Sequence, residues 1–259
     1  MPIPTTTKRT KVGQDISSLG NLIFMYDAND LVNAYANGDL VSSLNDLSGN
    51  GFTMTGTTTS RPTLVTNADT NGNAAMLFDG GDILSMADSN YLDNLLIEGN
   101  NGMTFFEVIS STSNNGIQQV TWAKSTQSAT GPLLWTRNVL DVVYPSLFIG
   151  DGGSNYLERR GGTGIYNAGV KIITFDSTAT TKQSYMDGVS QTMTTMYSSG
   201  TGKFAGNATG ASIGQAGGGG MPFFGSIYLV GAFMGILNAN TRLTLNRILS
   251  ARFQISIVQ

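Results

Sequence analysis

The sequence contains no cysteine and no histidine among its 259 residues. Without cysteine the chain cannot form disulfides or thiolate metal sites, and its redox compartment stays undetermined. Without histidine it lacks the commonest general base and the commonest metal ligand of proteins. A catalytic triad of the Ser-His-Asp type is therefore excluded.

Charge is also scarce. Charged residues make up 12% of the chain, about half the share of an ordinary soluble domain. The formal net charge is −3, so the chain lacks the general basic field through which proteins bind nucleic acid. Nucleic acid is therefore not an expected partner.

What the sequence does contain favours β-structure. Hydrophobic residues are 40% of the chain, 33 residues are glycine, and threonine, serine and asparagine fill much of the remainder. Threonine suits a half-buried pleated surface, while glycine and asparagine supply the tight turns between strands. Because all-β sandwiches of this length often fold as one unit, we predict a single all-β domain.

One long uncharged run, residues 221–237, falls at the short limit for a membrane helix. It contains a proline and three glycines, and its β-branched and aromatic residues suit strands. We therefore predict a buried strand pair here and no membrane span. The N-terminal segment carries charge without a following apolar segment, so no secretory signal peptide is expected.

Two regions differ in pattern. Residues 1–20 hold two prolines, a threonine run and the cations Lys8, Arg9 and Lys11, without a convincing period. We interpret them as an extended arm that docks onto a partner through these cations; the alternative is an ordinary frayed terminus. Residues 21–259 are predicted to form the folded domain.

Short apolar runs separated by turn signals recur about every ten residues through the domain. The pairs Asn50-Gly51 and Asp187-Gly188 are hairpin-type turn signals. Only residues 238–252 have helical spacing, with Asn238 or Asn240 as the N-cap, and residues 253–258 read as a last strand. This pattern predicts a sandwich or jelly roll with one late helix.

Several segments occur in the order found in concanavalin A-like, laminin G-like jelly rolls. They are FMYDANDLVNAY (24–35), SSLNDLSGNGFTMTG (42–56), RPTLV (61–65), AAMLFDGGDIL (74–84), SYMDGV (184–189) and the closing segment 211–253. The chain thus resembles this family over nearly all of residues 21–259. The resemblance implies a concanavalin A-like jelly-roll sandwich of two antiparallel sheets with one short helix near the C-terminus. It says little about function, because jelly rolls host many functions.

Modules of this kind are often seen in phage particles and in bacterial surface or secreted proteins. The resemblance therefore implies a non-enzymatic accessory virion protein, such as a capsid decoration or fibre-associated domain, assembled in the host cytoplasm and located in the virion. Its partners would be other virion proteins, and by analogy it would be a homo-oligomer, with a trimer as the guess. The alternative is a lectin-like module that binds host surface glycan.

Aromatic and cationic residues supply the candidate glycan site. Tyr156 and Tyr166 are surrounded by polar, glycine-rich segments and would stack on sugar rings if exposed. Arg159 and Arg160 lie in what reads as a glycine-rich loop and would grip a carboxylate or phosphate. Trp122, Trp135 and Tyr144 would also stack on sugar rings if exposed on a concave face, but the commoner outcome for aromatic residues in strands is burial in the core.

Two acidic turns are candidate calcium sites. Asp79 and Asp82 offer hard oxygen ligands, and Asp27 and Asp30 form a second pair. The alternative is that these carboxylates accept backbone N–H bonds in their own turns. The family pattern has two consecutive aspartates where this chain has Gly81-Asp82, which weakens the calcium assignment. No other cofactor is expected.

A third interpretation is a glycoside hydrolase or lyase. Related glucanases place acidic residues on alternate positions of one strand, so that two carboxyls face the same sugar. Here the only glutamates are Glu98, Glu107 and Glu158, and no E-x-D-x-x-E pattern exists. We therefore predict no catalytic residues and no enzymatic activity.

Overall fold

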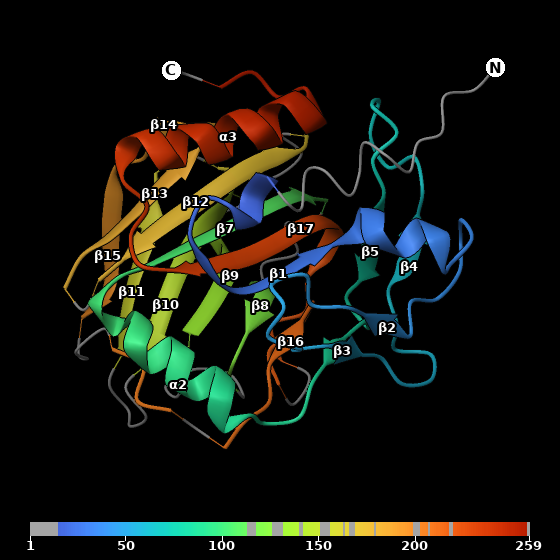
Figure 1. The fold of residues 1–259 in the computed structure, drawn as a ribbon, viewed down its shortest axis with the longest axis horizontal. Coiled ribbons are helices and arrows are strands. Elements are labelled where there is room, and N and C mark those ends of the chain that lie inside the picture. The colour runs from blue at the N-terminus through green and yellow to red at the C-terminus, as the bar shows by residue number, and fades with distance from the viewer. Residues whose placement is uncertain are drawn as a thin grey trace.

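The computed structural model describes residues 15–112, 118–125, 132–139, 142–150, 156–162, 164–165, 169–178, 180–198, 203–206, 208–217 and 220–257. Within these residues the strands form two antiparallel sheets (Figure 1). Sheet A has eight strands: β1 (Asn21–Asp27), β4 (Thr63–Val65), β5 (Ala75–Asp79), β7 (Met103–Ser111), β12 (Lys171–Ser177), β13 (Lys182–Met186), β14 (Val189–Ser190) and β17 (Phe224–Met234). The all-β jelly-roll sandwich predicted from the sequence is confirmed.

Sheet B has nine strands within the same described residues. They are β2 (Ser43–Leu44), β3 (Met54–Thr55), β6 (Leu84–Ser85), β8 (Gln119–Ala123), β9 (Pro132–Val139), β10 (Val142–Gly150), β11 (Tyr156–Gly161), β15 (Met193–Ser198) and β16 (Ser212–Ile213). The helical elements are η1 (Ala28–Asn33), α2 (Asn90–Glu98), η2 (Gly99–Asn101) and α3 (Ala239–Phe253), and residues 15–17 are helical as well.

The strand order places non-consecutive strands side by side. Sheet A runs β14-β13-β12-β7-β17-β5-β4, with β1 also paired to β17, and sheet B runs β15-β11-β10-β9-β8-β16-β6-β3-β2. The long uncharged run contributes β17, a single strand of 11 residues that pairs with β1, β5 and β7. The run was predicted to form a strand pair, but it forms one long central strand. At Gly225 and Gly231 of this strand a side chain would clash with the Ser110 backbone and the Phe106 ring, so glycine allows the neighbouring strand to approach closely. Among the described residues no helix is long and apolar enough to cross a membrane.

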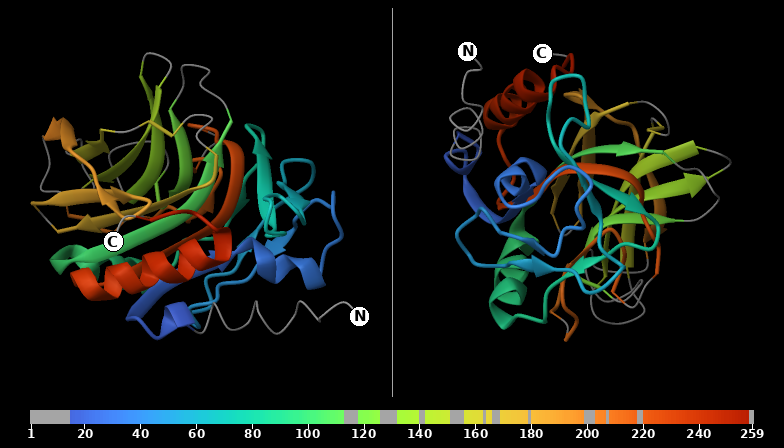
Figure 2. Two further views of the ribbon diagram at one scale, coloured as in Figure 1. Left: turned by 90° about the horizontal axis from the view of Figure 1, so that it is seen from above. Right: turned by 90° about the vertical axis from the view of Figure 1, so that its right-hand side faces the viewer.

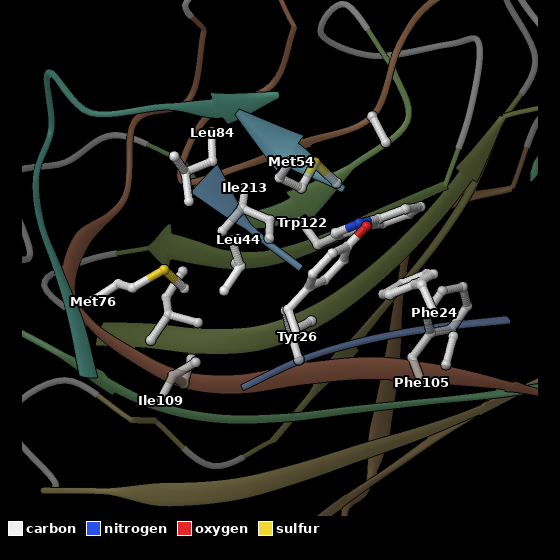
Figure 3. Packing of buried hydrophobic residues seen from close by; sticks show 14 of the residues in the cluster. Phe24, Tyr26, Leu44, Met54, Met76, Leu84, Phe105, Ile109, Trp122 and Ile213 are labelled. Carbon is white, nitrogen blue, oxygen red and sulfur yellow. The ribbon is translucent and has the colours of Figure 1, made fainter. Parts of the chain in front are cut away.

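The main core lies between the two sheets (Figure 3). Trp122 of β8 is fully buried, and its ring stacks on Phe24 of β1 with centroids 4.4 Å apart. Phe105 of β7 contacts the same indole at 6.3 Å. Large aromatic side chains from opposite sheets thus fill the interior, and Trp122 belongs to the core, as the commoner outcome for strand aromatics predicts.

A second core covers the outer face of sheet A. Along β7, Phe105 and Ile109 point between the sheets while Phe106 and Val108 point outward, as the two-residue period of a strand requires. Helix α3 covers this outer face with Leu245, Leu249 and Phe253 (Figure 2). Because these strands are buried on both faces, their sequences are continuously apolar and do not alternate between apolar and polar residues.

The predicted C-terminal helix is confirmed, and Asn238 caps it by accepting the N–H of Thr241 at 3.0 Å. The predicted strand over residues 253–258 is wrong. Phe253 is the third member of the helix's buried stripe, and Gln254 ends the helix in the left-handed region at φ 50°. Residues 255–257 follow without strand pairing.

A second α-helix, α2, was not predicted. Ser89 caps it by accepting the N–H of Leu92, and Leu92 and Leu96 anchor it to the main core. Nine residues give little periodic signal, which is why the expectation of one helix near the C-terminus was incomplete.

Candidate functional site

The outer face of sheet B carries the strongest candidate site, and strand register determines which side chains lie there. In the β10–β11 pair, Ser146 lies opposite Arg160, Leu147 opposite Arg159, and Phe148 opposite Glu158. Leu147 belongs to the core between the sheets, whereas Phe148 belongs to a separate cluster with Val120 and Ala123 of β8. Because paired residues share a face, Ser146, Phe148, Glu158 and Arg160 lie on the outer face.

Arg160 and Tyr144 form the centre of this site. The guanidinium carbon of Arg160 lies 4.6 Å from the centroid of the Tyr144 ring. This is a cation–π arrangement, with the guanidinium over the aromatic face. Tyr144 and Arg160 are each partly exposed, so the stacked pair is accessible from solvent.

Two polar atoms beside this pair are buried without hydrogen-bond partners among the described residues. They are Nη1 of Arg160 and Oγ of Ser146, whose residues are direct neighbours across the two strands. Buried polar groups are normally satisfied, since leaving one unpaired costs about 1–3 kcal/mol. Both atoms therefore keep hydrogen-bonding capacity that the described residues do not use. We refer to Tyr144, Ser146 and Arg160 as the outer-face site.

Arg159 lies on the other side of the same strand. It faces inward, and its charge adds to burial in lowering the pKa of Lys182 to about 7. The Lys182 ammonium donates to the carbonyl oxygen of Thr178 at 2.5 Å. The glycine-rich loop predicted around the two arginines is therefore wrong: they lie on strand β11, whose alternation sends neighbouring side chains to opposite faces. The side chains of Arg159 and Arg160 therefore do not contact one ligand group together.

The other predicted glycan and docking residues are only partly described. Tyr156 begins β11 and lies opposite Gly150 in the backbone register. Tyr166 and the arm cations Lys8, Arg9 and Lys11 lie outside the described residues. Tyr156 and Tyr166 as sugar platforms, and the three cations as docking residues, stay predictions.

The turn between β5 and β6 holds the predicted calcium ligands. The Asp82 carboxylate accepts the backbone N–H of Asp79 at 2.9 Å, and the Asp79 carboxylate accepts that of Gly81 at 2.8 Å. Burial, together with the nearby Asp79, raises the pKa of Asp82 to about 6. Within the described part of the chain no three acidic side chains gather as a metal-binding group. Calcium at this turn stays a prediction.

In the second acidic pair, Asp27 has a different role. Both carboxylate oxygens of Asp27 accept from the Arg252 guanidinium, at 2.6 Å each. Asp27 also caps η1 by accepting the N–H of Asn29. This aspartate therefore ties β1 to the end of α3, and its oxygens are already engaged.

The three glutamates do not converge on one face. Glu107 is fully buried, in register with the core residues Val230 and Ile173, and accepts the Thr121 hydroxyl at 2.5 Å. Glu158 lies on the outer face of sheet B, and Glu98 ends α2. A glycosidase pair made of two of these glutamates is not formed.

Comparison with known proteins gives the fold alone. No protein-family model matches the sequence, and no curated protein matches it. Among solved structures, domain 4 of AbnA, a GH43 extracellular arabinanase from Geobacillus stearothermophilus in complex with arabinotriose, is 16% identical with a TM-score of 0.56, over 88% of this chain and 98% of that one.

Toxin binding domains are similar as well. The binding domain of Paraclostridial Mosquitocidal Protein 1 is 12% identical with a TM-score of 0.60, over 90% of this chain and 53% of that one. The binding domain of botulinum neurotoxin DC, in complex with SialylT, is 11% identical with a TM-score of 0.58, over 90% and 52%. This chain therefore spans about half of each toxin domain. Because the identities are this low, the structural similarity shows a shared β-sandwich fold alone.

Proposed function

We propose that this chain is a non-catalytic binding module that recognises carbohydrate through the outer face of sheet B. The observation that carries the proposal is the outer-face site, where Arg160 is stacked on Tyr144. One guanidinium nitrogen of Arg160 and the hydroxyl of Ser146, the residue opposite it across the strand pair, have no hydrogen-bond partner among the described residues. An aromatic ring next to unsatisfied polar groups matches the apolar faces and hydroxyls of a sugar.

The fold comparisons support a binding role. The arabinanase domain is matched over nearly its whole length, and that domain's structure contains arabinotriose. The toxin domains are named as binding domains, but only about half of each corresponds to this chain. Helix α3 packs on the outer face of sheet A, whereas Tyr144 and Arg160 on the outer face of sheet B stay partly exposed beside the buried cluster of Val120, Ala123 and Phe148.

A glycan array followed by calorimetry tests the proposal. Arg160→Ala should weaken binding of the selected oligosaccharide about 10- to 100-fold, because a hydrogen bond to a charged group contributes about 1.5–3 kcal/mol. Tyr144→Ala should also weaken it, because it removes the ring that would stack on the sugar and that holds the Arg160 guanidinium. Tyr156→Ala and Tyr166→Ala test the remaining predicted sugar platforms in the same assay.

Leu77→Ser is the matched control, because Leu77 is 41% exposed on the outer face of sheet A. It should bind like the unmodified protein, and all variants should keep the same circular dichroism. An empty array, or binding that survives both Arg160→Ala and Tyr144→Ala, would contradict the outer-face site. Turnover of the bound polysaccharide would contradict the non-catalytic assignment.

The more specific setting that we propose is a virus particle. Support comes from the ordered motifs that resemble jelly-roll modules of phage particles, and from the cations Lys8, Arg9 and Lys11 ahead of the domain. Density-gradient fractionation with mass spectrometry should find this polypeptide in stoichiometric amounts with intact particles. Deleting residues 1–14 should release it while the domain stays folded. Recovery only in the soluble fraction would contradict the virion role without affecting glycan binding.

A further inference from the structure

Strand β15 is an edge of sheet B. Within the part of the chain that the structure describes, it pairs with β11 alone. It is 6 residues long, whereas β2 at the other edge of sheet B has 2 residues. At the ends of sheet A, β14 and β4 have 2 and 3 residues. Strand β1 has 7 residues and pairs only with β17, but its other side is already bonded, because the Met25 N–H donates to Asp46 and the Met25 carbonyl accepts from Leu47. Figure 1 shows β15 at one margin of the molecule.

The devices that usually protect an edge strand are few here. Natural edges carry lysine, inward-pointing charge, proline or a bulge that discourages pairing with another chain. Between Asp187 and Lys203 the sequence holds no charged residue and no proline. One irregularity occurs between Thr195 and Tyr197, but residues 193–195 are in continuous register with β11. Thr194 and Thr195 are exposed.

We infer that β15 is a self-association edge, through which two copies of this chain join antiparallel about a two-fold axis. A two-fold axis brings identical residues together, so a charged edge would repel its own copy, whereas this uncharged edge does not. Threonine pairs favourably with threonine across antiparallel strands. The uncharged, threonine-containing sequence of β15 is therefore compatible with pairing to a second copy of itself.

Such a dimer would extend sheet B across the axis. An antiparallel pair within one sheet is related by an axis perpendicular to that sheet, so both outer faces point the same way. Arg160 is in register with Thr194 of β15, so the outer-face sites of two copies would lie one strand from the axis on each side. Bivalent glycan binding would follow; that consequence rests on the proposed function, whereas the self-association does not.

Charge placed at Thr195 tests the inference by sedimentation velocity of the full chain. The unmodified protein and Thr195→Val should sediment as dimers. Thr195→Glu and Thr195→Lys should each sediment as monomers, because each copy would bring the same charge into the short paired segment 193–195. An equimolar mixture of these two variants should recover the dimer, since opposite charges then face each other. Circular dichroism of each variant confirms folding.

Every other result would overturn the inference. A monomeric unmodified protein would remove it, and so would a dimer that persists in both charged variants. A trimer, or an open polymer that grows with concentration, would show a head-to-tail contact instead of a two-fold one. If glycan binding fails while the charge-swap mixture still dimerises, the proposed function fails and the self-association stands.

Discussion

Glu107 is a carboxylic acid enclosed in the core of the sandwich. Burial raises its pKa from 4.5 to about 7, against a smaller lowering by the hydrogen bond from Thr121. One carboxylate oxygen, Oε1, has no hydrogen-bond partner among the described residues. The neutral acid is therefore the form that the core favours, since ionisation would place an unpaired charge there.

This burial makes stability depend on pH. Below pH 4.5 the carboxyl is protonated in both the folded and the unfolded chain. Between pH 4.5 and 7 the unfolded chain loses this proton first, so the free energy of unfolding falls as the pH rises, by about 3 kcal/mol in total. Glu107→Gln should abolish that fall. In urea unfolding from pH 4 to pH 8, the free energy of unfolding of the variant should increase relative to that of the unmodified protein as the pH rises.

A constant difference in the free energy of unfolding between the two proteins over this range would contradict a raised pKa at Glu107. The comparison isolates this group because other shifted groups, such as Asp82 and Lys182, are the same in both proteins.

The limits of sequence reasoning are clearest at single residues. Tyr144, Arg159 and Arg160 were all named from the sequence, yet the stack of Arg160 on Tyr144 was not predicted. Assigning residues 156–161 to a strand would have separated the two arginines to opposite faces, but the flanking glycines favoured a loop. The burial of Lys124 against Asp88 and Asp93, at 2.7 Å each, joins residues more than 30 positions apart. Local sequence holds no signal for such a contact.

At the scale of elements, α3 is joined to β1 by one buried ion pair. The side chains of Arg252 and Asp27 are 8% and 6% exposed, and their contact is bidentate. Removing one partner of such a pair leaves a buried charge uncompensated and typically costs about 3–5 kcal/mol.

A double-mutant cycle tests this role. Arg252→Met alone should destabilise the protein by that amount in urea, whereas Arg252→Met combined with Asp27→Asn should recover part of the loss. The asparagine keeps an oxygen to cap η1. Additive effects of the two substitutions would contradict direct coupling between Arg252 and Asp27.

Strands and the long helix were the readily predicted elements. The apolar runs of β1, β7, β12 and β17 and the spaced leucines of α3 carry strong patterns, because each packs a face against a core. Helix α2 and the end of α3 were not predicted correctly. A nine-residue helix presents few periods, and the choice between helix and strand for residues 253–257 depends on where the chain leaves the surface of sheet A.

At the scale of the molecule, the folded domain includes residues that precede its first strand. Ile16 is fully buried in the outer core of sheet A, with Leu19 partly buried beside it. Deleting residues 1–14 should leave the melting temperature unchanged, while deleting residues 1–19 should remove an Ile and a Leu side chain from this core. The cost of losing one such buried side chain is about 2–5 kcal/mol.

Ile16→Ala in the full chain is the matched control, and it should reproduce much of the larger deletion's effect in a thermal melt. Equal melting temperatures for the two deletions would contradict a structural role for residues 15–19. The same pair of deletions separates attachment from folding, because only the shorter one removes the arm cations and spares Ile16.

The whole sandwich could be predicted from the sequence because alternating patterns and turn signals repeat along its length. The ligand surface could not, because it depends on which residues of β10 and β11 meet across the sheet. That register is set by packing of Leu147 and Ile149 into the core, and one residue of slip would turn Arg160 inward.

Backbone amide shifts during titration with the oligosaccharide selected on the array test whether glycan binds at the outer-face site. We expect the largest shifts in β10 and β11, at Tyr144, Ser146 and Arg160 and their strand neighbours, with the outer face of sheet A unchanged. Shifts confined to α3 or to the exposed surface around Leu77, with β10 and β11 unmoved, would contradict binding at this site.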